Sequence, residues 1–230
     1  MSPGENLSKD RAESTAYSCS PEQTISFDDI LSKYRRESSS QRDMGTKFEK
    51  IMQAFLLTDS YYRERFENVW TWSDFSKLEK LDSSRDMGID LVTRTRDGEY
   101  WAVQCKCFKE GSRIDKPAVD TFLSTSSKTF GRVKFSKRLF ISTTKNFGDG
   151  AREAFRNQNP AVHCISIDYL RGSKVDWKVL ESGVFGKKAR LPSKSIRPHQ
   201  EKALELAKNH YRLQNRGQLI MACGTGKTFT

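Results

Sequence analysis

Apolar residues recur every three to four positions in two early stretches of the chain, which is the spacing of one helix face. The first stretch predicts a short helix from about Ser26 to Tyr34. The second predicts a longer amphipathic helix from about Gln41 to Leu57. Residues 1–24 hold only scattered apolar positions and cannot bury enough surface to order themselves, so we expect a mobile tail there.

The period changes to two between Met87 and Cys107, where we expect two short strands joined by a turn. Ile89 and Leu91 alternate with Asp90 in the first strand, which predicts that the carboxylate points to the opposite face. Asp97-Gly98 is a hairpin-turn signal at the centre of the segment. This hairpin is the element around which the rest of the sequence is interpreted.

Alternation in the second strand of the hairpin places Val103, Cys105 and Cys107 on one face, with Gln104 and Lys106 on the other. The hairpin can therefore gather the carboxylate of Asp90, the carboxamide of Gln104 and the ammonium of Lys106 at one sheet edge. A carboxylate and a second oxygen donor can hold Mg²⁺, and a lysine can steady a water or a phosphate.

Further elements surround the hairpin and predict an α/β fold. A strand ending near Trp72 precedes it, and Asp74 is interpreted as a cap or turn residue in preference to a metal ligand. After it come a helix opened by Pro117, a buried strand, a helix from about Asp149, and a last strand. The buried strand covers 138–142 and the last strand 162–167. The order is a helix, three antiparallel strands, then helix, strand, helix and strand, which predicts a mixed sheet flanked by helices.

Composition narrows the class of protein. The 230 residues carry a formal net charge of +11, which a basic surface alone could explain but which a polyanionic partner explains better beside a candidate phosphodiester site. The five cysteines show no zinc-ligand spacing, which favours a reducing compartment. No apolar run is long enough to cross a membrane, and the N-terminus lacks the apolar segment of a signal peptide. We expect a cytoplasmic, prokaryotic protein with no membrane partner.

The sequence GID, followed fourteen residues after its aspartate by QxK, resembles the PD-(D/E)XK nucleases. Within them it resembles the Mrr-like branch, in which Gln replaces the second acid. The resemblance implies a restriction-endonuclease-like fold and Mg²⁺-dependent hydrolysis of double-stranded DNA. Asp90, Gln104 and the backbone carbonyl of Cys105 would be metal ligands, and Lys106 would orient or deprotonate the attacking water. The same resemblance implies that Glu49, on the flank of the long helix, completes the metal shell.

Later segments narrow the resemblance. The stretches DTFLSTSSKTF, RLFISTTKNF, RNQNPAVH and VDWKVLESG are similar to the nuclease end of type ISP, single-chain type I-like, restriction-modification enzymes. We therefore expect a nuclease domain over 25–182. The resemblance implies an ATP-dependent enzyme that cleaves foreign unmethylated DNA, with downstream helicase, methyltransferase and target-recognition domains as its partners.

The C-terminal part of the chain predicts the start of a motor. Residues 183–195 are rich in Gly, Pro and Lys without periodicity, which predicts a basic linker. Residues 196–230 open with RPHQ, a helix and a strand over 216–222, and then read ACGTGKT. This pairing resembles the Q motif and the phosphate-binding loop of superfamily 2 helicases, and implies a truncated RecA-like start.

By that resemblance Gln200 would recognise the adenine of ATP. The phosphate-binding residues would be Gly224, Gly226, Lys227 and Thr228. Because this sequence stops at Thr230, we expect it to bind ATP weakly or not at all and not to hydrolyse it.

Two other functions are compatible with the sequence. A nuclease-like module without chemistry could clamp DNA for a helicase, although the complete set of Asp90, Gln104 and Lys106 argues against it. A repair or junction nuclease fused to a helicase would prefer branched over linear DNA. The set also has a purely structural explanation, in which Asp90 is a surface carboxylate and Gln104 and Lys106 lie on a surface strand, without a shared site.

Overall fold

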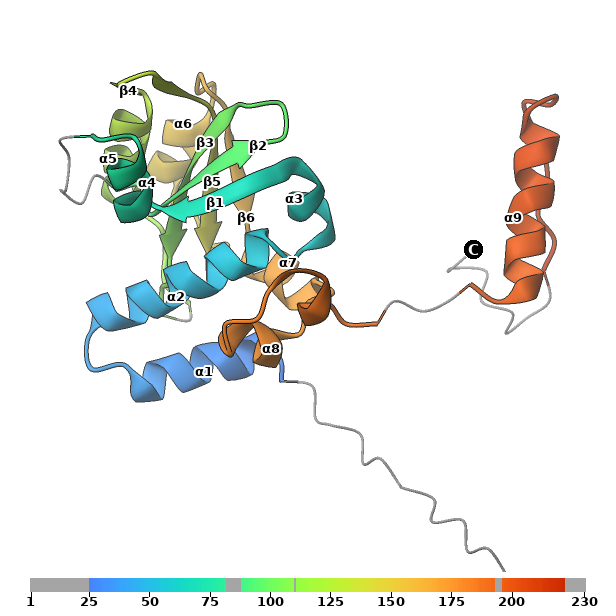
Figure 1. Cartoon of the computed structure of the whole chain (residues 1–230), viewed down its shortest axis with the longest axis horizontal. Helices are drawn as coiled ribbons and strands as arrows, with labels where there is room; N and C mark the ends of the chain where they lie inside the picture. Colours follow the sequence, from blue (N-terminus) through green and yellow to red (C-terminus); the bar gives the residue numbers. More distant parts are fainter. Residues whose placement is uncertain (1–24, 82–87, 110, 193–195, 222–230) are drawn as a thin grey trace, which may run out of the picture.

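Six strands form one mixed sheet in the part of the chain that the computed structural model describes, residues 25–81, 88–109, 111–192 and 196–221 (Figure 1). The strand order is β1-β2-β3-β5-β4, and β6 pairs with β5 as well. The strands are β1 (Phe66–Thr71), β2 (Leu91–Thr95), β3 (Tyr100–Lys106), β4 (Thr129–Phe130), β5 (Val133–Ser142) and β6 (Val162–Ile165).

The pairing of the strands confirms the predicted order. Strands β1, β2 and β3 are antiparallel neighbours, whereas β5 runs parallel to both β3 and β6. The β2–β3 turn contains Gly98 at φ +83°, a left-handed conformation that glycine adopts without steric cost. Parallel neighbours require crossover connections, and helices supply them here.

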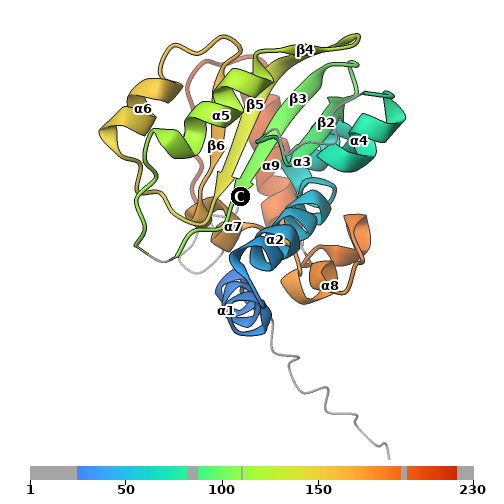
Figure 2. The same ribbon diagram turned by 90° about the vertical axis from the view of Figure 1, so that its left-hand side faces the viewer.

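Helices cover both faces of the sheet (Figures 1 and 2). On one face α2 packs against β1 and β3, and α1, α7 and α8 extend the same core. On the other face lie α4, α5 and α6. The bounds are α1 (Phe27–Glu37), α2 (Gln41–Leu56), α3 (Ser60–Arg65), α4 (Trp72–Leu78), α5 (Pro117–Ser126), α6 (Asp149–Phe155), α7 (Ile167–Gly172), α8 (Trp177–Glu181) and α9 (Pro198–Tyr211).

The two helices predicted first are confirmed by their burial. The apolar positions of α1 and α2 that share one face are all buried in the core on the α2 side of the sheet. Side chains of Ser26 and Ser40 accept hydrogen bonds from the backbone of the first turns, which explains where each helix begins. The spacing of apolar residues was therefore a sufficient signal for both helices.

The alternation predicted for the first hairpin strand is wrong at its start. The strand begins at Leu91, and Ile89 packs in the core on the α5 side, whereas Leu91 packs on the α2 side. Ile89 and Leu91 therefore do not share a face. The reason is that Asp90 precedes the strand and lies in a backbone segment that does not follow the pleat.

Several other elements differ in extent from the prediction. The strand predicted from Arg138 is the second half of β5, which begins at Val133. The short helices α3 and α4 were not predicted, because six or seven residues are too few to show a clear period. Residues 82–87, between α4 and the hairpin, lie outside the described residues, as do residues 1–24.

Part of the segment predicted as a linker packs on the sheet domain. Gly186–Ala189 is a short 3-10 helix, η1, and Ala189 is fully buried in the core. The Arg190 Nε donates to the Thr58 carbonyl at 2.7 Å, and the Gly186 N–H donates to the Thr58 hydroxyl at 2.8 Å. The absence of periodicity in this segment did not mean an absence of contacts.

The helix predicted after RPHQ is confirmed as α9, with Pro198 as its first residue. The strand predicted over 216–222 is not formed in residues 216–221, which have no regular secondary structure. Gly224, Gly226, Lys227 and Thr228 lie outside the described residues, so the RecA-like start stays a prediction. None of the described helices combines the length and apolar character that crossing a membrane requires.

Candidate active site

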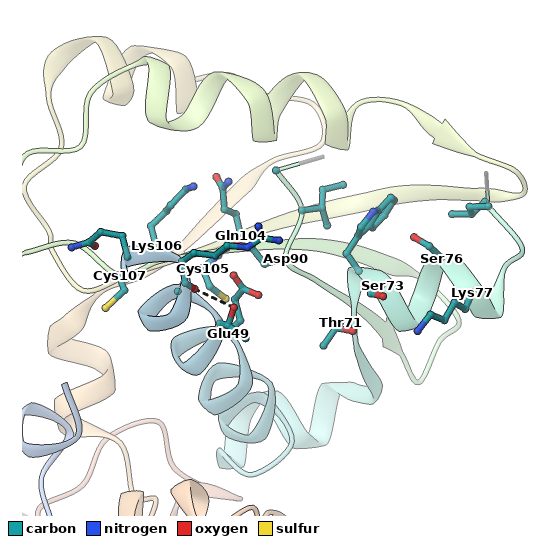
Figure 3. Close-up of a pocket in the computed structure, with 18 of the residues that line it drawn as sticks. Glu49, Thr71, Ser73, Ser76, Lys77, Asp90, Gln104, Cys105, Lys106 and Cys107 are labelled. Atoms are coloured by element: carbon teal, nitrogen blue, oxygen red, sulfur yellow. Dashed lines mark hydrogen bonds between the residues drawn. The ribbon is translucent and has the colours of Figure 1, made fainter. Parts of the chain in front are cut away.

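A cavity of about 690 Å³ opens beside the ends of β2 and β3 (Figure 3). It is lined from α2, from α4 and the turn after it, from the segment before β2, and from the end of β3. Glu49, Asp90, Gln104, Cys105 and Lys106 all line it. The structure thus brings together, in one cavity, the residues that the sequence singled out for metal binding and hydrolysis.

Three hydrogen bonds fix Asp90 in this cavity. The backbone N–H of Cys105 donates to the Asp90 Oδ2 at 2.6 Å, which holds the carboxylate against strand β3. The backbone N–H of Asp90 donates to the Val103 carbonyl at 2.9 Å, and the N–H of Trp72 donates to the Asp90 carbonyl at 2.9 Å. The carboxylate is therefore positioned by β3 and by the start of α4 together.

Gly88 is a positioning residue that the sequence reasoning missed. Its φ is +70°, and a Cβ atom at this position would lie 3.0 Å from the Thr121 Cγ2 and 3.4 Å from the Phe122 backbone nitrogen. The chain therefore passes so close to α5 that a side chain would push the Asp90 segment outward. The glycine of the GID sequence was the available signal.

The predicted alternation of side chains along β3 is confirmed at the end of the strand that lines the cavity. Val103 and Cys105 belong to the core on the α2 side, and Ala102 belongs to the core on the α5 side. Gln104 and Lys106 share the parity of Ala102 and rise toward α5 in Figure 3. Gln104 is only 2% exposed, and its Oε1 has no hydrogen-bond donor among the described residues. A buried carbonyl oxygen without a donor is costly, and so it marks a place where a cation or donor is expected.

Glu49 approaches from the other direction, projecting from α2 in Figure 3. Burial raises the pKa of the Cys105 thiol well above its usual value, and the negative charges of Asp90 and Glu49 raise it further. Both carboxylates are therefore close enough to Cys105 to act on the same group. Direct contact of Glu49 with a metal ion stays a prediction.

The donor set suits a hard cation held through oxygen atoms. Within the described residues, no group of three or more His, Cys, Asp and Glu side chains could hold a metal ion. The cavity instead offers two carboxylates, the unpaired amide oxygen of Gln104 and backbone carbonyls. Mg²⁺ binds through one or two carboxylates and retains several waters, so this set fits Mg²⁺ better than Zn²⁺.

Cationic side chains surround the carboxylates in the same cavity. Arg42 of α2 and Lys77 and Lys80 on the α4 side line it, together with Lys106. The sequence reasoning did not single out Arg42, Lys77 or Lys80, because no local pattern shows that α2 and the α4 side line the same cavity as Asp90. A cavity that pairs carboxylates with flanking cations suits a phosphodiester, which needs both a metal site and compensation of its own charge.

Two further predicted residues have a structural explanation. Asp74 is confirmed as a capping residue: its carboxylate accepts from the Thr71 hydroxyl at 2.8 Å, and its N–H donates to that hydroxyl at 3.2 Å. Gln200 lies in the first turn of α9, where its Oε1 accepts from the Arg197 N–H at 2.9 Å. This contact is a helix cap, and adenine recognition by Gln200 stays a prediction.

Comparisons with known proteins show which family the sequence and the fold resemble. A family model described as a restriction endonuclease, Mrr_cat_2, matches residues 57–185, more than half of the chain. The structure is similar to that of the ATP-dependent type ISP restriction-modification enzyme LlaBIII bound to DNA, with 29% identity, a TM-score of 0.63 and 89% of this chain covered. The chain spans 12% of the length of that enzyme.

A second similar structure is the MspJI restriction endonuclease in complex with a 27-mer oligonucleotide. The identity is 16% and the TM-score 0.40, and the match covers 66% of this chain and 31% of that chain. No curated protein sequence matches the chain.

Proposed function

The chain belongs to the restriction endonuclease family, and we propose that it hydrolyses phosphodiester bonds of double-stranded DNA with Mg²⁺ bound in the Asp90 cavity. The most direct support is that one cavity contains both an anchored carboxylate and a buried amide oxygen that has no hydrogen-bond donor. Asp90 is fixed by the Cys105 N–H, and the Gln104 Oε1 lacks a donor among the described residues. Both features are expected where a cation normally sits.

Each residue has a distinct task in this proposal. Asp90, the Gln104 Oε1 and the Cys105 carbonyl would be ligands, and Glu49 would complete the shell directly or through a water. When bound, Mg²⁺ lowers the pKa of a coordinated water and offsets the charge of the phosphate. Lys106 holds the attacking water and balances the negative charge that develops on the phosphorane. Because Gln104 replaces an acid, we expect metal affinity to be weak until DNA phosphate adds oxygen ligands.

We also propose that this domain works within a longer ATP-dependent enzyme. The similarity to the type ISP enzyme supports a downstream helicase, a methyltransferase and a target-recognition domain, which would direct cleavage to foreign unmethylated DNA. Gln200 and the loop residues Gly224, Gly226, Lys227 and Thr228 would then bind ATP in the longer chain.

Nicking of supercoiled plasmid by the 230-residue chain tests the proposed chemistry. Wild type should nick in Mg²⁺ and stop when EDTA is added. Asp90→Ala and Lys106→Ala should each lower the rate by about 10²-fold or more, the scale measured for loss of a single electrostatic catalytic group, while DNA binding is nearly retained. Rates at increasing Mg²⁺ concentration separate weak metal binding from absent chemistry.

Asp74→Ala is the matched control, because it removes a carboxylate from the start of α4 that does not line the cavity. It should weaken the helix cap but leave nicking near the wild-type rate. Undiminished nicking by Asp90→Ala would end the assignment. Tight DNA binding by a wild-type chain that never nicks in any divalent metal would favour a DNA-clamping module.

A further inference from the structure

One wall of the cavity, formed by α4 and the turn after it, carries serine and lysine side chains, whereas the opposite wall holds the carboxylate of Asp90. Ser73, Ser76, Lys77 and Lys80 stand at i, i+3, i+4 and i+7, and all four line the cavity. This spacing puts Ser73, Ser76 and Lys77 on one side of α4, and Lys80 lines the cavity from the turn after the helix, where its φ is +51°. We call these four residues the α4 stripe.

Three other residues at the start of α4 are held in the core or in the helix cap. Trp72 and Phe75 are buried in the core on the α5 side of the sheet. The acid Asp74 is used in the cap with Thr71 and does not line the cavity. The α4 stripe therefore presents hydroxyl and ammonium groups without an opposing carboxylate from the same helix.

Several polar groups on this wall have no partner among the described residues. Ser76 is only 6% exposed, yet its Oγ has no partner among the described residues. The indole Nε1 of Trp72, which also lines the cavity and can only donate, likewise lacks an acceptor there. Lys77 and Lys80 form no ion pair with a described carboxylate.

The two sides of the cavity offer groups of opposite kind. The Gln104 Oε1 only accepts hydrogen bonds and can bind a cation, whereas the ammonium groups of Lys77 and Lys80 only donate and can bind an anion. A metal ion alone therefore matches the Gln104 oxygen but not the two ammonium groups. A ligand that matches both must carry an anionic group beside the metal site.

We propose that the α4 stripe is a phosphate-binding subsite for the DNA backbone, taking a phosphodiester next to the one held at the Asp90 site. This proposal rests on the proposed nuclease function, since the same strand would have to occupy both walls. The cavity of about 690 Å³ lies in the range of sites that hold more than one small group. Lysine ammonium groups and a hydroxyl are suited to phosphate oxygens whatever the base sequence.

The experiment measures binding of a fluorescent DNA duplex to the 230-residue chain in EDTA, at several salt concentrations, so that no cleavage occurs. Lys77→Gln with Lys80→Gln should weaken binding about tenfold and reduce the slope of log K against log salt by about 2, the value expected for two lost phosphate contacts. Lys77→Arg with Lys80→Arg should bind as wild type does.

The matched control is Lys187→Gln with Lys188→Gln, which removes the same charge from the exposed 3-10 helix η1 outside the cavity. It should change affinity and slope far less. Equal effects of the two double variants would overturn the subsite, because only general electrostatics would then remain.

Ser76→Ala gives a second, charge-free test. The unpaired buried hydroxyl contributes nothing to the free fold, so the melting temperature should not fall, while DNA affinity should drop about threefold. Unchanged affinity would overturn the subsite as described here.

Plasmid nicking distinguishes failure of this subsite from failure of the proposed chemistry. A wild type that nicks, with Lys77→Gln/Lys80→Gln behaving like the control, would leave the nuclease standing and remove the subsite. If the wild type binds DNA through these lysines but never nicks it, the subsite would stand and the proposed nuclease function would fail.

Discussion

Two buried polar side chains lie on the same face of neighbouring strands but differ in whether their polar atoms are hydrogen-bonded. Gln104 on β3 and Arg138 on β5 lie on the α5 side of the sheet, since Ala102 pairs with Arg138 and Gln104 with Phe140 in the parallel register. Gln104 is 2% exposed and Arg138 is fully buried. Burial alone therefore does not separate them.

The difference lies in their hydrogen bonds. The Arg138 Nε and one terminal nitrogen donate to the hydroxyls of Ser126 and Ser127, each at 2.6 Å, and the other terminal nitrogen donates to the Pro160 carbonyl. The guanidinium thus ties the end of α5 to the segment before β6. Gln104, by contrast, keeps an unpaired oxygen at the end of β3. A buried group that is satisfied inside the chain supports the fold, whereas an unsatisfied one that lines a cavity is available to a ligand.

Arg138 should give the largest effect on stability. Arg138→Leu removes the guanidinium donors from a buried network of neutral acceptors, and burial already lowers the pKa of this guanidinium. We expect the free energy of unfolding to fall by about 3 kcal/mol, the scale for orphaning one side of a buried charged network. Denaturant unfolding measures it.

Arg152→Leu is the control for this change, because Arg152 is 61% exposed in a surface ion pair with Asp149. Its loss should cost well under about 1 kcal/mol. Similar costs at both positions would contradict the view that Arg138 is a structural centre. Arg138→Lys should not rescue, since one ammonium cannot span acceptors on two separate segments.

Gly88→Ala is expected to have the next largest effect. It tests the part of the comparison that concerns the cavity, because Gly88 lies in the segment that carries Asp90. A Cβ at φ +70° and 3.0 Å from the Thr121 Cγ2 should cost about 1–3 kcal/mol in backbone strain and displaced neighbours. The displaced segment carries Asp90, so nicking should fall more than stability does.

Gly98→Ala provides a matched control, with φ +83° but no heavy atom within 4 Å of the added Cβ. It should lose stability through its backbone conformation while keeping the nicking rate of the remaining folded protein. If Gly88→Ala keeps the wild-type rate as well, Gly88 does not position the carboxylate.

The sequence could predict those parts of the fold that depend on one element at a time. The apolar stripes of α1 and α2 and the alternation of Val103, Gln104 and Cys105 report which face of an element is buried. The hairpin pairing brings the segment of Asp90 beside the end of β3, and Asp90, Gln104 and Lys106 line one cavity as expected. The sequence did not predict that the start of α4 also holds this segment.

What the sequence could not predict depends on contacts between distant segments. Lys77 and Lys80 reach the Asp90 cavity only because the start of α4 is bonded to Asp90 through the Trp72 N–H. The full burial of Arg138 depends on α5 and on the segment at Pro160 closing over it. Neither arrangement leaves a periodic signal, since each joins residues from elements that are separate in sequence.

The smallest expected effect decides whether the Gln104 oxygen serves to bind a ligand. Gln104→Leu removes a buried acceptor that has no donor, so the metal-free chain should be as stable as wild type or more stable by up to about 1 kcal/mol. Gln53→Leu is the contrasting change, because the Gln53 Nε2 donates to the Val69 carbonyl at 2.9 Å and its removal should cost about 1 kcal/mol. Chemical unfolding in EDTA measures both, and plasmid nicking in Mg²⁺ should fall only for Gln104→Leu. A Gln104→Leu chain that loses as much stability as Gln53→Leu would mean that Gln104 is satisfied within the fold, which would remove the distinction between it and Arg138.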